Sequence, residues 1–256
     1  NSVLRDLQVT DNDAGGLRIG PGAAVFDCLA LRNGGDGLAA GAASVLCRCI
    51  ARDNRGHGLG VDLGGSVSHC AARENDLNGL LAGDGSTVIG TAVRGNSDHG
   101  IEVGVASSVT DSTAYGNSDD GFRLRAGGGR ISRCVAYQNS DFGFNVATGA
   151  MVRACVARKN VDAGVRAEAA CDLVEHACDE NAVGLEVQGQ GSRLEGNHAT
   201  GNGTGIRMVG SDNLVVKNTA TGNTTADYDV ASGNHFEQHS SPGANFPQEP
   251  WASFDF

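Results

Sequence analysis

Proline, aromatic residues and positive charge are scarce in this chain of 256 residues. It contains 4 prolines against 39 glycines, which excludes a collagen-like triple helix because that structure needs abundant proline. Aromatic residues make up only 5% of the chain, so the core must consist of aliphatic residues and cysteine, as in a narrow, regular interior. The net charge of −11 argues against nucleic acid as a partner, because phosphate binding depends on clustered basic side chains. No apolar run approaches the roughly 20 residues of a membrane span, so we expect no membrane partner either.

Asparagine recurs through almost the whole chain at one interval. The interval is 21 residues, except for one of 22 between Asn117 and Asn139. The series comprises Asn12, Asn33, Asn54, Asn75, Asn96, Asn117, Asn139, Asn160, Asn181, Asn202 and Asn223. Other positions keep the same register and give the template V-x-x-C-x-A-x-x-N-x-x-x-G-L-x-V. Apolar positions two apart indicate strands, and two short strands joined by a polar corner bury a face only by stacking on identical neighbours. The sequence therefore predicts an all-β solenoid of about 11 coils, each ~4.8 Å above the last.

The asparagine, the glycine and the cysteine of the template each have a predicted role. A buried amide at a tight corner needs partners, and in a stack each asparagine can donate to the one in the next coil, forming a ladder. The glycine after it is expected to supply a positive φ at the corner. Five cysteines share one inward column: Cys28, Cys49, Cys70, Cys134 and Cys155. In-register neighbours lie ~4.8 Å apart, farther than a disulfide prefers, so we expect free thiols.

This template resembles the right-handed parallel β-helix proteins of the pectate-lyase-like group, over about residues 3–230. The resemblance implies a right-handed, single-stranded parallel β-helix over residues 1–233, a polysaccharide as partner, and a secreted or cell-surface location. The activity motifs of the group are mostly missing. The G-H-G of polygalacturonases is matched at 56–58 and their paired aspartates at 119–120, but these lie three coils apart. The N-T-D, R-I-K and D-P-H-D elements are absent.

The composition changes sharply after residue 233. Residues 234–256 hold three of the four prolines and five aromatic residues, namely Phe236, Phe246, Trp251, Phe254 and Phe256. An open solenoid end exposes strand edges, so we predict that this tail caps the last coil. No comparable cap or signal peptide precedes the first coil. We therefore expect a trimmed chain, and an uncapped N-terminal end through which an oligomer could form.

The corner after the template asparagine carries the first candidate chemistry. Two and three residues beyond that asparagine, carboxylates and histidines stack up one edge, notably Asp98, His99, Asp119 and Asp120. Like charges at such spacing disfavour ionisation or recruit a cation, so this corner cluster suits acid–base catalysis or, through oxygen ligands, Ca²⁺. No other cofactor is indicated. The alternative is that N-S-D-H-G and N-S-D-D-G are simply favourable turn sequences.

A second column, two residues before the asparagine, holds arginines and then tyrosines. Its candidate substrate-binding residues are Arg73, Arg94, Tyr115 and Tyr137. Guanidinium groups pair with carboxylates, and aromatic rings stack on pyranoses, so the column suits an acidic sugar chain. The alternative is an ordinary solvated surface. A third column, which includes Glu102 and Arg123, alternates in sign and is predicted to form structural ion pairs between coils.

Two classes of function fit these columns. A lyase would use Arg94 to neutralise a uronate carboxylate and His99 or Tyr115 to abstract the neighbouring proton. A hydrolase would instead use paired carboxylates of the corner cluster. The alternative is a non-catalytic surface, adhesive or tailspike-like rod, which the short turns and the lack of long loops favour. We therefore predict a protein that binds or processes an acidic polysaccharide, with the rod as the alternative.

Overall fold

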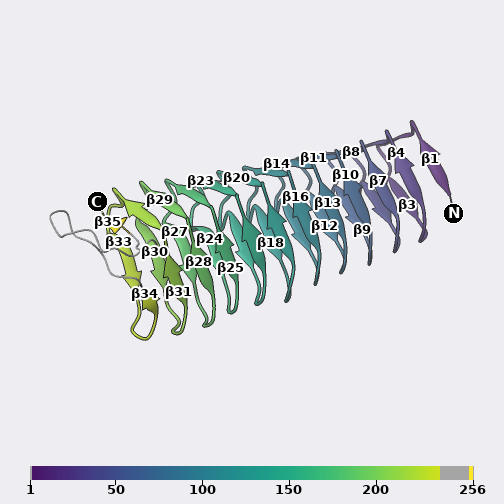
Figure 1. The fold of residues 1–256 in the computed structure, drawn as a ribbon. Helices are drawn as coiled ribbons and strands as arrows, with labels where there is room; N and C mark the ends of the chain where they lie inside the picture. Colours follow the sequence, from purple (N-terminus) through teal and green to yellow (C-terminus); the bar gives the residue numbers. More distant parts are fainter. Residues whose placement is uncertain (1, 237–253, 256) are drawn as a thin grey trace.

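The computed structural model describes residues 2–236 and 254–255, which form a column of stacked coils (Figure 1). Each coil has three short strands separated by tight corners. Strands one coil apart pair in parallel, so the column has three parallel sheets, named A, B and C in the order in which the chain enters them. This confirms the predicted all-β solenoid of about 11 coils. In this part of the chain there is no helix, and so none able to cross a membrane.

The strands are short and evenly spaced. Sheet A comprises β1 (Val3–Arg5), β4 (Ala24–Phe26), β7 (Val45–Cys47), β10 (Ser66–Ser68), β13 (Thr87–Ile89), β16 (Ser108–Thr110), β19 (Arg130–Ser132), β22 (Met151–Arg153), β25 (Asp172–Val174), β28 (Arg193–Glu195), β31 (Leu214–Val216) and β34 (His235–Phe236). Sheet B comprises β2 (Gln8–Thr10), β5 (Leu29–Leu31), β8 (Ile50–Arg52), β11 (Ala71–Arg73), β14 (Ala92–Arg94), β17 (Thr113–Tyr115), β20 (Val135–Tyr137), β23 (Val156–Arg158), β26 (Ala177–Asp179), β29 (His198–Thr200), β32 (Thr219–Thr221) and β35 (Phe254–Asp255). Sheet C comprises β3 (Leu17–Ile19), β6 (Leu38–Ala40), β9 (Leu59–Val61), β12 (Leu80–Ala82), β15 (Ile101–Val103), β18 (Phe122–Leu124), β21 (Phe144–Val146), β24 (Ala163–Ala167), β27 (Val183–Val187), β30 (Thr204–Met208) and β33 (Ala226–Val230).

Each coil contains three strands, whereas the sequence predicted two. The V-x-x-C-x-A segment of the template divides into a strand of sheet A and a strand of sheet B, such as β7 and β8. Between these two strands Arg48 has a φ of 53°, and Asp27 and His69 have φ values of 56° and 54° at the same corner of neighbouring coils. The missed signal was the spacing of three residues, rather than two, between the valine and the cysteine of the template. That spacing breaks the strand alternation and marks the bend.

The asparagine ladder runs through the column as predicted. Nδ2 of Asn75 donates to Oδ1 of Asn96 at 2.9 Å, and Nδ2 of Asn96 donates to Oδ1 of Asn117 at the same distance. Each of these Oδ1 atoms also accepts the backbone N–H of the preceding ladder asparagine. At the C-terminal end of the ladder, Asp227 replaces a further asparagine as the acceptor: its Oδ1 accepts a hydrogen bond from Asn223 Nδ2 at 2.8 Å. Because these amides are paired, the ladder holds the corners between sheets B and C in register.

The glycine after each ladder asparagine does not have the predicted role. Gly100 and Gly121 are not among the residues with a positive φ, and the left-handed residue of this corner stands directly before the asparagine, as at Glu74. A Cβ on Gly100 would lie 2.7 Å from Asn117 Nδ2 and 2.6 Å from the carbonyl oxygen of Gly121. The glycine is therefore required for the close approach of the next coil, and not for its own backbone conformation.

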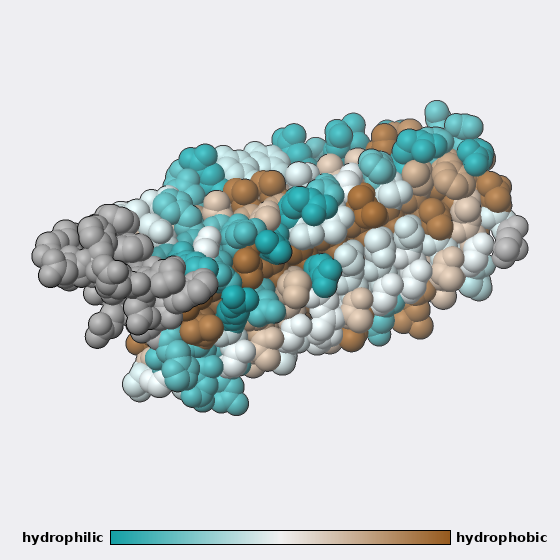
Figure 2. Space-filling model, viewed as in Figure 1, coloured by the Kyte–Doolittle hydropathy of each residue, from teal (hydrophilic) through white to brown (hydrophobic). Residues whose placement is uncertain are grey.

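The interior is narrow and largely aliphatic. All eight cysteines are free thiols, which confirms the prediction for the inward column. The two largest buried rings, Phe122 and Phe144, stack on each other with centroids 4.8 Å apart. Since inward positions are filled by core side chains, the candidate sites lie on the outer faces and corners. On the face seen in Figure 2, hydrophilic and hydrophobic patches alternate along the column.

The two ends of the column differ. The predicted capping tail, 234–256, lies mostly outside the described residues, and within them β34 pairs with β31 of sheet A and β35 with β32 of sheet B. At the other end, Leu4, Val9 and Leu17 of the first coil are only partly buried against the core. The N-terminal end therefore presents some apolar surface.

Candidate functional site

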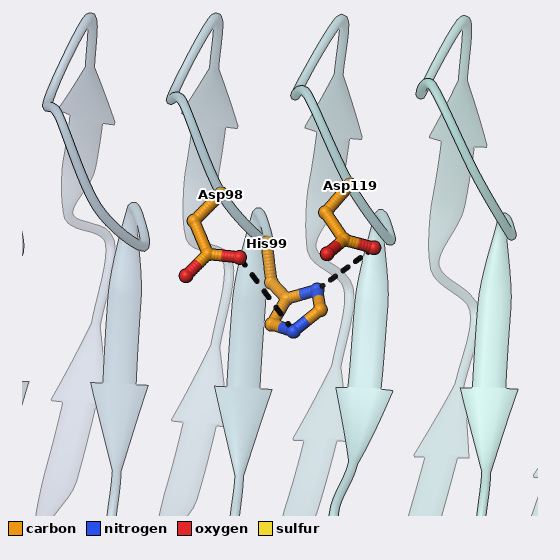
Figure 3. Close-up of side chains that lie close together, drawn as sticks. All are labelled: Asp98, His99 and Asp119. Carbon is orange, nitrogen blue, oxygen red and sulfur yellow. Dashed lines mark ion pairs between the residues drawn. The ribbon is translucent and has the colours of Figure 1, made fainter.

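The corner between sheets B and C positions the predicted cluster. Asp98 and His99 lie between β14 and β15, and Asp119 and Asp120 occupy the same positions one coil later, between β17 and β18. The coils are in register, so side chains 21 residues apart become neighbours. Figure 3 shows His99 between Asp98 of its own coil and Asp119 of the next.

His99 is the centre of this cluster. Its Nε2 lies 3.7 Å from Asp98 Oδ1, and its Nδ1 lies 3.5 Å from Asp119 Oδ1 and 3.6 Å from Asp120 Oδ2. The side chains of Asp98 and Asp119 are 38% and 39% exposed, whereas those of His99 and Asp120 are 5% and 1% exposed. Two carboxylates thus face solvent, with the imidazole and a third carboxyl group beneath them. The structure brings together all four corner residues that the sequence indicated.

Arg123 completes the cluster, although the sequence placed it in a column of structural ion pairs. Its Nη1 lies 2.7 Å from His99 Nε2. A guanidinium only donates, so Nε2 carries no proton in this arrangement, and the ring proton lies on Nδ1, facing Asp119 and Asp120. The backbone N–H of Asp120 also approaches Nδ1, at 3.3 Å, but it has a closer acceptor in Asp119 Oδ1 at 2.9 Å. The signal that could have found Arg123 is its spacing of 24 residues from His99, at which a corner side chain meets the outward strand position of the next coil.

Asp120 is held under the cluster by its own partners. Its Oδ2 accepts Asn145 Nδ2 at 3.0 Å, and its Oδ1 accepts the backbone N–H of Phe142 at 3.3 Å. Burial raises the pKa of Asp120 to about 6, against the lowering effects of Asn145 and His99. The pKa of Asp141, in the next coil, is raised by burial and by the charge of Asp119. The cluster therefore contains a carboxyl group that exchanges its proton near neutral pH.

Two overlapping groups offer the ligand atoms of a metal site within the described residues. In each, the ligand atoms all lie within 4.8 Å of one another; the groups are Asp98, His99 and Asp119, and Asp119, Asp120 and Asp141. In the first group the positive charge of Arg123 stands at His99 Nε2 and opposes a cation there. The second group supplies only carboxylate oxygens, the ligands that Ca²⁺ prefers, so it fits that ion better.

The outer face of sheet C is hollowed beside this corner. One hollow of about 510 Å³ lies over the first coils, and its lining includes Arg18, His57 and Arg125. A second hollow of about 370 Å³ is lined in part by Arg123, Arg125 and Arg166. Because Arg125 lines both, we treat them as one feature, the sheet C trough.

The shared arginine comes from an irregular coil. The coil of 22 residues has its extra residue in the corner 125–129, which joins β18 to β19. Arg125 pairs from there with Glu102, at 3.1 Å. The predicted alternation of ion pairs therefore does not hold for Glu102 and Arg123, since each has a different partner.

The arginine–tyrosine column lies on another face. Arg73, Arg94, Tyr115 and Tyr137 are the last residues of β11, β14, β17 and β20, on the outside of sheet B. The rings of Tyr115 and Tyr137 stack with centroids 5.4 Å apart, and Arg94 Cζ lies 5.1 Å from the Tyr115 centroid on the strand below. In this geometry the arginine that contacts His99 is Arg123, not Arg94. Tyr115 has a neighbour toward each ring face, which leaves its edge and hydroxyl for a ligand.

Comparison of the sequence with known families identifies the family of the chain. The model of the right handed beta helix region matches residues 80–225. The chain belongs to this family. The handedness that the resemblance implied is thereby confirmed for the β-helix. No curated protein matches the sequence.

Solved structures of similar fold include an epimerase, a lyase and a tailspike protein. The A-module of the mannuronan C-5 epimerase AlgE4 from Azotobacter vinelandii is 16% identical, with a TM-score of 0.69 over 91% of this chain and 79% of that one. The Dettilon tailspike protein is 11% identical, with a TM-score of 0.61 over 99% of this chain and 61% of that one. Pectate lyase Pel9A is 17% identical, with a TM-score of 0.51 over 90% of this chain and 65% of that one. At such identities the likeness shows a shared β-helix fold.

Proposed function

We propose that this β-helix binds and processes an acidic polysaccharide in the sheet C trough, with its chemistry at His99. The observation that carries the proposal is the contact of Arg123 with His99 Nε2 at a trough lined by four arginines. Arg125 already pairs with Glu102 and Arg166 with Glu168, so on this chain of net charge −11 the local site for a carboxylate is the guanidinium of Arg123. The similar structures include enzymes named for mannuronan and pectate, two polymers of uronic acids, and this supports the ligand class.

Arg123 would couple binding to chemistry. Without ligand its guanidinium donates to His99 Nε2, which covers that nitrogen and prevents it from acting as a base. A uronate carboxylate in the trough would draw the guanidinium away, because a charge-assisted pair with a carboxylate is stronger than a hydrogen bond to a neutral imidazole. The lone pair of Nε2 would then face the bound sugar. Asp119 and Asp120, near Nδ1, would hold the tautomer and stabilise the imidazolium that forms.

The freed Nε2 would abstract the proton on the carbon next to the uronate carboxylate, while Arg123 neutralises the charge that develops on that carboxylate. In a lyase, the electron pair then forms a carbon–carbon double bond, and the bond to the neighbouring sugar oxygen breaks. That oxygen takes up a proton from water, because Asp120 is 1% exposed and lies at Nδ1, on the other side of the imidazole from Nε2. In an epimerase, the carbon instead regains a proton on the opposite face. Hydrolysis is the second candidate, since Asp98 and Asp119 present two half-exposed carboxylates.

A non-catalytic rod is the alternative function. The short corners between strands and the similarity in fold to a tailspike protein favour it. In that case the trough binds polysaccharide and His99 has a structural role. Either form of the proposal supports a secreted or cell-surface location, where acidic polysaccharides occur.

Calcium is a separate proposal at the same corner. The oxygen ligands of Asp119, Asp120 and Asp141 would bind Ca²⁺ and relieve the repulsion between these carboxylates. With the ion bound, Asp120 would stay ionised. Ca²⁺ should raise the thermal midpoint more than Mg²⁺ does, and Asp141→Asn should remove the difference. Equal responses of the wild type to both ions would contradict this site.

A panel of polyuronates and neutral polysaccharides tests the main proposal. Ultraviolet absorbance detects the unsaturated product of a lyase, NMR detects inverted sugars, and a reducing-end assay detects hydrolysis. Arg123→Gln should weaken polyuronate binding and abolish turnover, while His99→Gln should abolish turnover and retain binding. Arg207→Gln is the matched control, because Arg207 holds the same outward position in sheet C and its guanidinium pairs with Asp229. Unchanged binding by Arg123→Gln would refute the trough, and binding without any product would identify the rod.

A further inference from the structure

Three arginines form an in-register column on the outside of sheet B. Arg52, Arg73 and Arg94 end consecutive strands, and the register pairs Arg73 with both of the others. Their backbones are therefore one strand spacing apart, ~4.8 Å. All three side chains are exposed. Like charges directly opposite on neighbouring strands are unfavourable. Arg52 pairs with Asp53 at 3.0 Å and with Glu74 at 3.5 Å, so the repulsion that lacks compensation is between Arg73 and Arg94.

Elsewhere on the surface of the β-helix, an exposed arginine forms an ion pair with an acidic residue of the neighbouring coil. Asp11 pairs with Arg32 at 2.7 Å, and Asp27 pairs with Arg48 at 2.6 Å, in each case one coil apart. Arg158 stands in the same column as Arg73, four coils away, and it pairs with Asp179 at 3.1 Å. Within the described residues, Arg73 makes no ion pair, and the contact of Arg94 is the ring of Tyr115. Among the described residues, Arg73 and Arg94 are therefore two neighbouring guanidinium groups without a carboxylate partner.

The surroundings of these arginines form a flat surface. The adjacent outward positions of the same strands are Ala71, Ala92 and Thr113, which are too small to wall off the arginines. Beyond Arg94 the column continues with the stacked pair of Tyr115 and Tyr137, whose rings are inclined by 12°. A long, thin polyanion could lie along the column axis, with anionic groups at the guanidinium groups and hydroxyl groups at the tyrosine edges.

We infer that the sheet B column of Arg73, Arg94, Tyr115 and Tyr137 is a second, non-catalytic binding surface for acidic polysaccharide. It would anchor the polymer on a different face from the sheet C trough. Its ligand class rests on the proposed function, but its location does not. Two faces that bind one long chain raise the effective concentration at the trough, so long polymers gain affinity that short oligomers lack. An acidic polysaccharide is favoured over nucleic acid because Arg94 and Tyr137 occupy the two faces of the Tyr115 ring, so that a base cannot stack there, whereas a sugar hydroxyl can reach the phenol edge.

Binding of long polygalacturonate, measured by biolayer interferometry at low and high salt, tests this inference. The double variant Arg73→Gln/Arg94→Gln should raise the Kd for the long polymer about 5- to 20-fold and reduce the salt dependence of binding. Its Kd for a trisaccharide of the same polymer, and its turnover, should stay within about twofold of the wild type. Arg158→Gln is the matched control, because it removes an arginine of the same column that already has partners. Circular dichroism verifies that each variant is folded.

The possible outcomes separate the two surfaces. If the double variant binds the long polymer as the wild type does, the sheet B surface is refuted, whatever Arg123→Gln shows. If the double variant weakens binding and Arg123→Gln does not, the sheet B surface stands and the trough falls. Neutral dextran should not bind, and dextran sulfate distinguishes a general polyanion surface from one that prefers carboxylates. Tighter binding of single-stranded DNA than of polygalacturonate would refute the assigned ligand class.

Discussion

Replacement of His176 by asparagine should stabilise the protein, increasingly so as the pH falls. His176 is buried at the corner between β25 and β26, where its Nδ1 accepts the backbone N–H of Cys155 and its Nε2 has no hydrogen-bond partner. One coil later, Asn197 occupies the same position, where its Nδ2 donates to Leu173 O and Asn218 Oδ1 and its Oδ1 accepts the backbone N–H of His176. Asn197 and Asn218 thus form a second asparagine ladder, and an asparagine at position 176 would extend it by one coil toward the N-terminus.

The magnitude follows from opposing terms. Removing a buried, unpaired N–H recovers roughly 1–3 kcal/mol. The smaller asparagine leaves unfilled volume, which costs roughly 1 kcal/mol. At pH 7 we therefore expect a net gain of about 0–2 kcal/mol in the free energy of unfolding, or a rise of up to a few degrees in the thermal midpoint.

The pH dependence gives the sharper test. Burial lowers the pKa of His176 from 6.5 to about 4. The unfolded chain therefore binds a proton below pH 6.5 that the folded protein excludes, so the wild type loses stability as the pH falls from 6.5 toward 4. The full loss is about 3 kcal/mol, and the asparagine variant escapes it. Thermal unfolding followed by circular dichroism at several pH values would measure the difference.

A surface histidine provides the control. His198→Asn makes the same substitution at an exposed residue of β29 and controls for the loss of a histidine as such. A constant difference between His176→Asn and wild type from pH 7 to pH 4 would show that His176 does not titrate as its burial requires. A variant less stable than wild type at every pH would show that the extra ladder rung does not form.

Further predictions concern the corner between sheets B and C. Gly100→Ala should lower the free energy of unfolding by roughly 2–4 kcal/mol in denaturant titrations, because its Cβ would lie 2.6 Å from Gly121 O, whereas Gly60→Ala, with its nearest atom at 3.8 Å, should be neutral. Equal stability of these two variants would refute the close-approach role of the ladder glycine. Asp120→Asn should be roughly 1–3 kcal/mol more stable than wild type at pH 8, because burial raises the pKa of Asp120 to about 6 and so penalises its ionised form. This gain should disappear as the pH falls below the ordinary aspartate value of 3.8, and a gain that persists there would contradict the assignment.

The sequence predicted what depends on vertical register. A period of 21 residues was sufficient to place Asn75, Asn96 and Asn117 in one ladder and to bring Asp98, His99 and Asp119 together. It did not reveal the path of the chain within a coil, because short strands and left-handed corner residues leave only a weak alternation signal. The third strand and the true role of the glycine were missed for this reason.

Arg123 was missed for a different reason. Its neighbours one coil away are Glu102 and Asn145, and a reading along the column pairs it with the acidic one. The contact with His99 runs diagonally, from the corner of one coil to the middle of a strand in the next. The repeat period predicts which residues lie directly above and below a position in the neighbouring coils. Diagonal partners depend on the length and direction of the side chains, and the template contains no information on either.

The difference between vertical and diagonal contacts also distinguishes a functional site at this corner from a favourable turn sequence. As a turn explanation requires, the side chains there accept backbone N–H groups from the next coil: Asp36 accepts from His57, and Asp120 accepts from Phe142. That pattern does not require an arginine at His99 Nε2, nor a carboxyl group with a pKa near neutrality. Among the described residues, these two features occur where the corner meets the outward residues of sheet C. The case for chemistry at this corner therefore depends on the diagonal contacts, and Arg123→Gln tests it more directly than replacement of any aspartate in the repeat.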